Sequence, residues 1–105
     1  MGLTIFWTDF AKIEVKIIYS FFKKDSSKEV AIKVVNGITQ EVKILIKQPF
    51  LGQIEKALNE SEKEFRYLIS SNYKIIYWVN NSKNQIEIWD VFDCRQEPLK
   101  IKRTK

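Results

Sequence analysis

Residues 65–96, FRYLISSNYKIIYWVNNSKNQIEIWDVFDCRQ, predict three consecutive β-strands, and the rest of the chain is arranged around them. β-Branched and aromatic residues dominate these strands, as half-buried pleated surfaces require. The polar pair Ser71-Asn72 suits a turn after the first strand, and a polar run at 80–84 connects the second strand to the third. Such short connections predict an antiparallel meander. We expect the strands at 65–70, 73–79 and 86–93.

The N-terminal part predicts a short strand at 3–7 followed by a helix. The strand must pair with a strand of the meander to be stable. Thr8 is the expected N-cap of the helix, which runs to about residue 24. Its apolar residues fall on two stripes at helical spacing, and two stripes predict two neighbours, the sheet and the next helix. The stripes are Phe10, Ile13, Ile17 and Phe21, and Ala11, Val15, Ile18 and Phe22.

A second helix is predicted from about residue 27 to residue 47. Ser26 and Glu29 form a capping box at its start, and Pro49 follows its end. Gly37 in its interior costs about 1 kcal/mol relative to alanine, and a close approach of the first helix would explain the glycine. Two helices joined by a short link form an antiparallel hairpin.

The segment 48–64 is the least regular part of the chain. A helical turn is expected at 53–59, with Ile54, Ala57 and Leu58 pointing inward. The basic tail at 98–105 is expected to pack in part and to fray at its end.

The predicted fold class is α+β, with the element order β-α-α-β-β-β in a single domain at 1–105. A four-stranded antiparallel sheet combines the N-terminal strand with the C-terminal three-strand meander, and the helical hairpin packs on one face. The opposite face, with Trp78 and Trp89, is expected to be partly uncovered. An uncovered apolar face with basic edges indicates a macromolecular partner.

Composition restricts the possible chemistry. The net charge of +5, from 18 basic and 13 acidic residues, favours an anionic partner such as nucleic acid or an acidic protein. The single cysteine, Cys94, suits a reducing compartment, and no apolar run approaches the roughly 18 residues that span a bilayer. We therefore expect a cytoplasmic protein without a membrane segment. Because the sequence has no histidine and no glycine-rich phosphate loop, we expect neither a bound metal nor a cofactor.

Three basic residues lie near the ends of the predicted strands of the meander. Arg66 and Lys74 lie near the starts of the first and second strands, and Arg95 comes shortly after the third. If they converge on one end of the sheet, they would attract an anion. The alternative is that they are solvated strand ends, and for Arg95 an ion pair with Asp93 or Glu97. Both interpretations are open at the level of the sequence.

Several stretches, in this order, resemble the RelE/ParE toxins of bacterial type II toxin–antitoxin modules. They are Trp7-Thr8 before the helical hairpin, FLGQIE at 50–55, Arg66-Tyr67-Leu68, NYKIIY at 72–77, and above all VFDCRQEP at 91–98. The resemblance covers essentially the whole chain. It implies a small basic toxin that an acidic antitoxin wraps and inhibits, in a complex that binds promoter DNA through the antitoxin.

The family has two mechanisms, and the resemblance implies different roles for the cations in each. RelE-like members cut mRNA on the ribosome without a metal, and cations stabilise the transition state as the ribose 2′-hydroxyl attacks. Arg66, Lys74 and Arg95 match basic positions of those nucleases, and these are the candidate catalytic residues. However, Leu68 stands where many nucleases carry another basic residue, and the tail has no tyrosine or histidine.

ParE-like members instead inhibit DNA gyrase and are not enzymes. They tend to have a longer helical hairpin, as is predicted here. Gyrase inhibition is therefore the favoured prediction and ribosome-dependent mRNA cleavage the alternative. A basic RNA-binding module without toxicity also stays open. Trp78, Trp89 and Arg95 are the candidate partner-binding residues.

Overall fold

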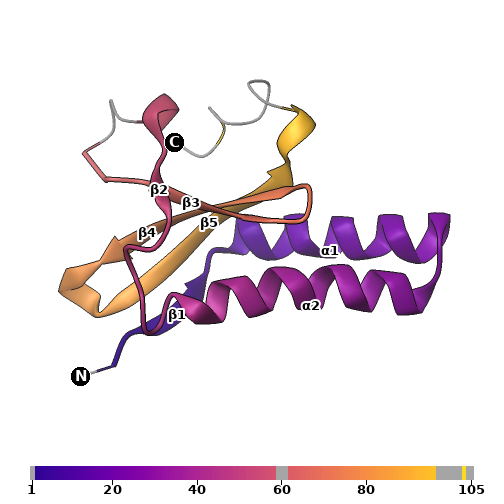
Figure 1. Ribbon diagram of the computed structural model, residues 1–105, viewed down its shortest axis with the longest axis horizontal. Helices are drawn as coiled ribbons and strands as arrows, with labels where there is room; N and C mark the ends of the chain where they lie inside the picture. The colour runs from indigo at the N-terminus through magenta and orange to yellow at the C-terminus, as the bar shows by residue number, and fades with distance from the viewer. Residues whose placement is uncertain (1, 59–61, 97–102, 104–105) are drawn as a thin grey trace.

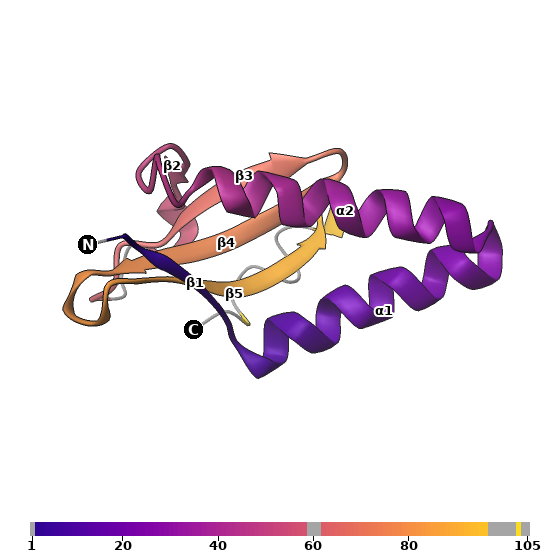
Figure 2. The same ribbon diagram turned by 90° about the horizontal axis from the view of Figure 1, so that it is seen from below.

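The computed structural model describes residues 2–58, 62–96 and 103. Two helices form an antiparallel hairpin that lies along one face of a sheet and extends beyond it (Figures 1 and 2). The predicted order β-α-α-β-β-β is confirmed, with one short strand added after the helices. The elements are β1 (Thr4–Trp7), α1 (Asp9–Asp25), α2 (Lys28–Ile44), β2 (Gln53–Ile54), β3 (Arg66–Ser70), β4 (Tyr73–Asn80) and β5 (Gln85–Asp93).

Side-chain caps fix the start of each helix. The Thr8 hydroxyl accepts a hydrogen bond from the amide of Ala11 at 3.1 Å, as predicted. At α2 the cap is Ser27, whose hydroxyl accepts from the amide of Val30 at 3.1 Å. The prediction of a capping box at Ser26 is therefore wrong by one residue, because Ser26 instead closes the C-terminus of α1 through its own amide, which donates to the Phe22 carbonyl.

The end of α2 and its internal glycine also differ from the predictions. The helix ends at Ile44 rather than at residue 47. The next residues form a tighter turn, in which the Leu45 amide donates to the Val42 carbonyl at 3.0 Å. Gly37 does not face α1. A Cβ atom there would lie 3.4 Å from the Ser70 hydroxyl oxygen, so the neighbour of this glycine is the end of β3.

The sheet has five strands in the order β1-β5-β4-β3-β2, and it is mixed. β1 pairs with β5 in parallel, from Thr4 opposite Gln85 to Trp7 opposite Ile88, while the other pairs are antiparallel. The prediction of a purely antiparallel sheet is therefore wrong for β1. α1 continues in the direction of β1 and α2 runs back antiparallel to it. β3 therefore has the same direction as β1 (Figure 1). Two further reversals then make β5 parallel to β1.

The fifth strand lies where a helical turn was predicted at 53–59. Gln53 and Ile54 instead pair with Tyr67 and Arg66 of β3, and only Lys56–Leu58 forms a 3₁₀ turn. Leu58 points inward as predicted and is fully buried. Ile54 is exposed, because it lies on a strand at the edge of the sheet.

The main core lies between the hairpin and the sheet. Ala11 and Ile18 of α1 are buried there, as are Ile38 and Val42 of α2. The other apolar stripe of α1 is solvent-exposed, so the prediction that each stripe has a neighbour within the chain is wrong. The sheet and α2 meet α1 on adjacent sides, and one stripe serves both neighbours. The exposed stripe consists of Phe10, Ile13, Ile17 and Phe21.

A second, smaller core covers the other face of the sheet. Leu58, from the segment after β2, is buried there against Ile76 and Phe92, together with Phe65. Trp78 and Trp89 are half-buried at the margin of this cluster. This face is therefore partly uncovered, as predicted, but the row of exposed apolar side chains on α1 was not predicted.

Candidate functional site

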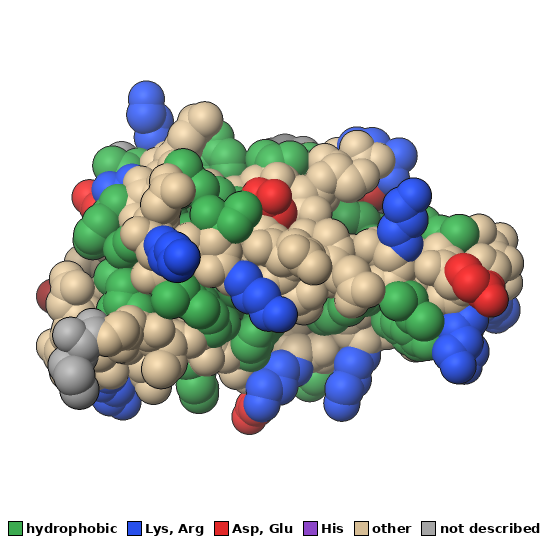
Figure 3. All heavy atoms as spheres, turned by 60° about the horizontal axis from the view of Figure 1, so that its bottom comes forward, with side chains coloured by type: hydrophobic (Ala, Val, Ile, Leu, Met, Phe, Trp, Pro, Cys, Tyr) green, Lys and Arg blue, Asp and Glu red, His purple; other side chains and the backbone are tan. Residues whose placement is uncertain are grey.

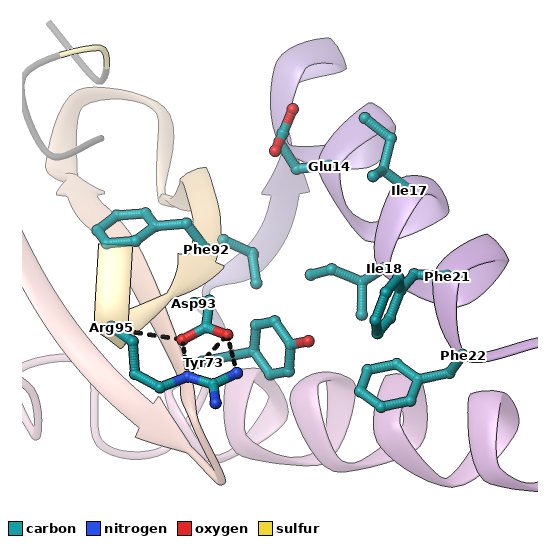
Figure 4. A pocket seen from close by; sticks show the side chains of 10 residues that line it. Glu14, Ile17, Ile18, Phe21, Phe22, Tyr73, Phe92, Asp93 and Arg95 are labelled. Atoms are coloured by element: carbon teal, nitrogen blue, oxygen red, sulfur yellow. Dashed lines mark hydrogen bonds and ion pairs between the residues drawn. The ribbon is translucent and has the colours of Figure 1, made fainter. Parts of the chain in front are cut away.

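A groove of about 350 Å³ lies between α1 and the adjoining ends of β4 and β5. Ile18 and Phe22 of α1 face Tyr73 across it, and Arg95 and Asp93 lie at one end (Figure 4). The groove exists because α1 extends past the end of β5, so its last turns overhang the sheet.

The exposed stripe of α1 adjoins the groove, and its last two residues, Ile17 and Phe21, line it. Its residues are spaced by three, four and four positions, which places Phe10, Ile13, Ile17 and Phe21 in one row about 16 Å long. Each of these side chains is between 42% and 56% exposed. A continuous row of large apolar side chains in water is typical of a protein-binding surface.

Arg95 and Asp93 form the polar end of the groove. The Arg95 guanidinium donates to both carboxylate oxygens of Asp93, with Nε–Oδ1 at 2.9 Å and Nε–Oδ2 at 3.2 Å. The hydrogen bond to Asp93 and its charge raise the pKa of Arg95, so the guanidinium stays charged. The Arg95 side chain is 76% exposed and the Asp93 side chain 17%. The predicted ion pair is confirmed, and Arg95 still has donors that face solvent.

Tyr73 lies next to this ion pair, opposite Asp93 in the ladder of β4 and β5. Its ring packs edge-on against Phe22 of α1, with centroids 6.5 Å apart. Burial, and then the charge of Asp93, raise the pKa of Tyr73 above its usual value. The phenol therefore stays protonated and can donate a hydrogen bond.

A buried charge cluster joins α1, β5 and the C-terminal tail. Arg103 donates to both carboxylate oxygens of Asp90, with Nε–Oδ2 at 2.8 Å and Nη2–Oδ1 at 2.9 Å, and to Glu14 at 2.9 Å. This cluster was not predicted from the sequence, although the tail was expected to pack in part and to fray at its end. Asp90 was the available signal, because a carboxylate within an apolar strand needs a buried cation. The rest of the tail, at 97–102 and 104–105, lies outside the described residues.

The candidate cations are not brought together. Arg66 stands opposite Tyr77 and shares the helix-covered face, whereas Lys74 stands opposite Phe92 on the other face. Along β3, Arg66 lies three residues from Ile69, the partner of Lys74, which is about 10 Å. Arg95 shares the end of the sheet with Lys74.

Arg66 and Lys74 also have partners within the chain. Arg66 donates to the carbonyl of Gly52 at 2.8 Å and to the Glu64 carboxylate at 3.1 Å. Lys74 Nζ lies 2.6 Å from Glu55 Oε2, and 4.1 Å from the centre of the Tyr67 ring. These contacts fasten the segment around β2 to the sheet.

The two candidate tryptophans are half-buried and partly covered by Lys63. The ammonium of Lys63 lies over both rings, 5.1 Å from the Trp78 centroid and 5.7 Å from the Trp89 centroid. Trp89 packs edge-on against Phe65 and donates to Glu87 at 3.1 Å. A base that stacked on the ring faces beneath Lys63 would have to displace it.

Comparison with solved structures identifies the fold. A chain of the structure described as the chromosomal ParDE TA system from P. aeruginosa matches with a TM-score of 0.71, over 87% of this chain and 95% of that chain, at 22% identity. A mutant of E. coli toxin RelE in the free state matches with a TM-score of 0.54, over 92% and 88%, at 13% identity. The chain has the RelE/ParE toxin fold. Neither the family models nor the curated protein sequences give a match.

The arrangement of the hairpin on the sheet determines the position of the groove. The helical hairpin lies on one face of the sheet and extends beyond it, and this overhang produces the groove (Figures 1 and 4). No helix within the described part of the chain has the length and apolar character needed to cross a bilayer.

Proposed function

We propose that this chain is the toxin of a type II toxin–antitoxin module and that it inhibits DNA gyrase in the manner of ParE-like toxins. The likeness to a chain of the ParDE system over almost the whole length supports the toxin assignment. The sequence resemblance of 91–98 and the net charge of +5 support it independently.

The observation that favours gyrase over mRNA is the pairing of the cations. A metal-independent nuclease needs several positive groups directed at one phosphate. Here Lys74 is buried with Glu55, and Arg66 lies on the opposite face with Glu64. Arg95 alone of the three has a largely exposed side chain. Such an arrangement supports a toxin that binds its target and does not cut it.

The groove supports the assignment of an acidic antitoxin as inhibitor. The exposed apolar row of α1, whose Ile17 and Phe21 line the groove, suits the apolar side of an amphipathic segment. Arg95 at one end and the exposed Lys23 and Lys24 near the end of α1 suit carboxylates. On this proposal the antitoxin covers Arg95, and any binding to promoter DNA occurs through the antitoxin.

Induction of the chain in bacterial cells tests the proposal. We expect growth arrest with early loss of negative supercoiling in a reporter plasmid, while incorporation of labelled methionine continues in the first minutes. Ile18→Glu, which places a charge in the core, is the inactive control.

Two other outcomes would contradict the proposal. An early stop of translation with normal supercoiling would assign the RelE-like mechanism. Normal growth in the presence of folded protein would assign a basic RNA-binding module without toxicity.

A further inference from the structure

The exposed row of α1 has nearly the same order of side chains in both directions. Phe10 and Phe21 stand at its ends, and Ile13 and Ile17 stand between them. If a second copy of the row is turned end to end, Phe10 comes beside Phe21 of that copy and Ile13 beside Ile17. The small inequality of the spacings shifts these pairs by only about 1.5 Å along the helix. The row is therefore self-complementary about a twofold axis, as a symmetric dimer requires.

Charged residues at the two ends of α1 suit the same arrangement. Asp9 in the first turn and Lys24 in the last turn are both exposed. At about 3.6 residues per turn, both lie on the side of the row away from Glu14. A twofold axis keeps this side of the two copies together, so that Asp9 of each copy approaches Lys24 of the other. Opposite charges then meet at both ends of the interface.

The other side of the row does not oppose the contact. Glu14 lies there, and two copies would bring its carboxylates toward one another. However, Arg103 donates to Glu14 at 2.9 Å within the same chain. Because the carboxylate is already paired with a cation, the repulsion between the two copies is reduced.

The hairpin-bearing face of the molecule is less suited to a second copy. Lysine and arginine side chains are spread over this face (Figure 3). On α2 they include Lys28, Lys33 and Lys43, which are all exposed. Two copies that met through this face would bring like charges together, which opposes association.

The size of the row indicates a weak contact. Its four side chains are between 42% and 56% exposed. Half of a large apolar side chain presents roughly 100 Å², so the row offers roughly 300–400 Å² per copy, against about 800 Å² per partner in a stable interface. We therefore expect association that depends on protein concentration.

We propose that the free chain forms a weak symmetric dimer through the exposed row of α1, with the two helices antiparallel about a twofold axis between Ile13 and Ile17. This self-association is independent of toxicity. Its consequence for regulation rests on the proposed function, which assigns the same row to the antitoxin. On that function the antitoxin and the second copy exclude one another, and binding of the antitoxin separates the dimer.

Sedimentation velocity of the full chain, from micromolar to near-millimolar concentration, tests the proposal. We expect a reversible shift from monomer to dimer as the concentration rises. Ile13→Glu places a charge in the apolar row and should weaken the dimer at least tenfold. Ile32→Glu is the matched control, because Ile32 is a similarly exposed isoleucine on α2, and it should leave the dimer unchanged.

Exchange of the end charges tests the antiparallel arrangement. Asp9→Lys and Lys24→Glu should each weaken the dimer about tenfold, because each contact occurs twice. The double variant should recover the dimer to within about threefold, since opposite charges meet again. Both substitutions disfavour the helix dipole, so a recovery cannot come from a more stable helix. This pair keeps the test valid if Ile13→Glu fails to fold.

Three results would overturn the proposal. One is a monomer over the whole range of concentration, which would leave the row to the antitoxin alone. Another is a dimer that Ile13→Glu and Ile32→Glu weaken equally, because it would form through a different surface. The third is a double charge variant no more dimeric than the single variants, which would exclude the antiparallel arrangement. None of these results depends on whether the chain inhibits gyrase.

Discussion

The ammonium of Lys74 lies 2.6 Å from a carboxylate oxygen of Glu55, and both side chains are more than nine-tenths buried. The pair joins β4 to the segment between β2 and the following 3₁₀ turn, on the face of the sheet away from the helices. A lysine held in this way neutralises a buried carboxylate. It is therefore not available to a phosphate in the folded chain as described.

Lys74→Met should destabilise the protein by about 3–5 kcal/mol, because it leaves the Glu55 carboxylate buried without its cation. The double variant Lys74→Met, Glu55→Leu should recover most of that loss, since both charges are then removed. Urea unfolding of the two single variants and the double variant measures the coupling. Additive losses in the double variant would show that the pair does not matter for stability.

Arg95→Glu should abolish toxicity and leave the free energy of unfolding nearly unchanged, because the side chain is exposed and surface ion pairs contribute little. Lys83→Glu is the matched control, an equal change of charge at an exposed turn between β4 and β5. Growth on induction and thermal unfolding are the measurements. A folded Arg95→Glu protein that remains fully toxic would contradict the assignment of Arg95.

The two internal glycines should respond to alanine in opposite directions. At Gly52 a Cβ would lie 2.6 Å from the Tyr67 carbonyl oxygen, so Gly52→Ala should destabilise the fold by more than about 1 kcal/mol. At Gly37 the nearest atom is an ordinary 3.4 Å away, so Gly37→Ala should stabilise it by about 0.5–1 kcal/mol. Urea midpoints report both effects, and a loss of stability in Gly37→Ala would show that β3 packs more tightly against α2 than described.

Stability should fall at alkaline pH because two tyrosines resist ionisation in the fold. Burial is the main cause that raises the pKa of Tyr77 and of Tyr73 above 10. The folded state therefore holds these protons more tightly than the unfolded state, and the contribution is present below about pH 10 and lost as the pH rises through the folded pKa. Tyr77→Phe should make the decline between pH 9 and 11 shallower in urea unfolding. A decline of equal slope in the variant would remove Tyr77 as a cause.

The helices, strands and turns could be predicted from the sequence because the residues that determine each of them lie close together in the chain. Thr8, the helical spacing of Ala11 to Phe22 and the turn at Ser71-Asn72 act over a few residues, and each is found as predicted. The direction of β1 was also implicit in the chain, since an out-and-back hairpin followed by two reversals makes β1 and β5 parallel.

Contacts between distant residues account for what the sequence did not predict. Periodicity defines both apolar stripes of α1 but not which one is buried, because Ile17 and Ile18 are the same residue type. Leu58 was predicted to point inward, but its position against Ile76 and Phe92 on the second face joins residues that are distant in the chain. Arg103 reaches Asp90 from the tail, and no local pattern joins them.

The most direct test of the central claim uses the purified chain in two reactions side by side: DNA supercoiling by gyrase, and bacterial translation with the mRNA followed by primer extension. Inhibited supercoiling with intact mRNA is the predicted result. Ribosome-dependent cuts in the mRNA with normal supercoiling would contradict the account, and would require that Lys74 leave Glu55 on the ribosome.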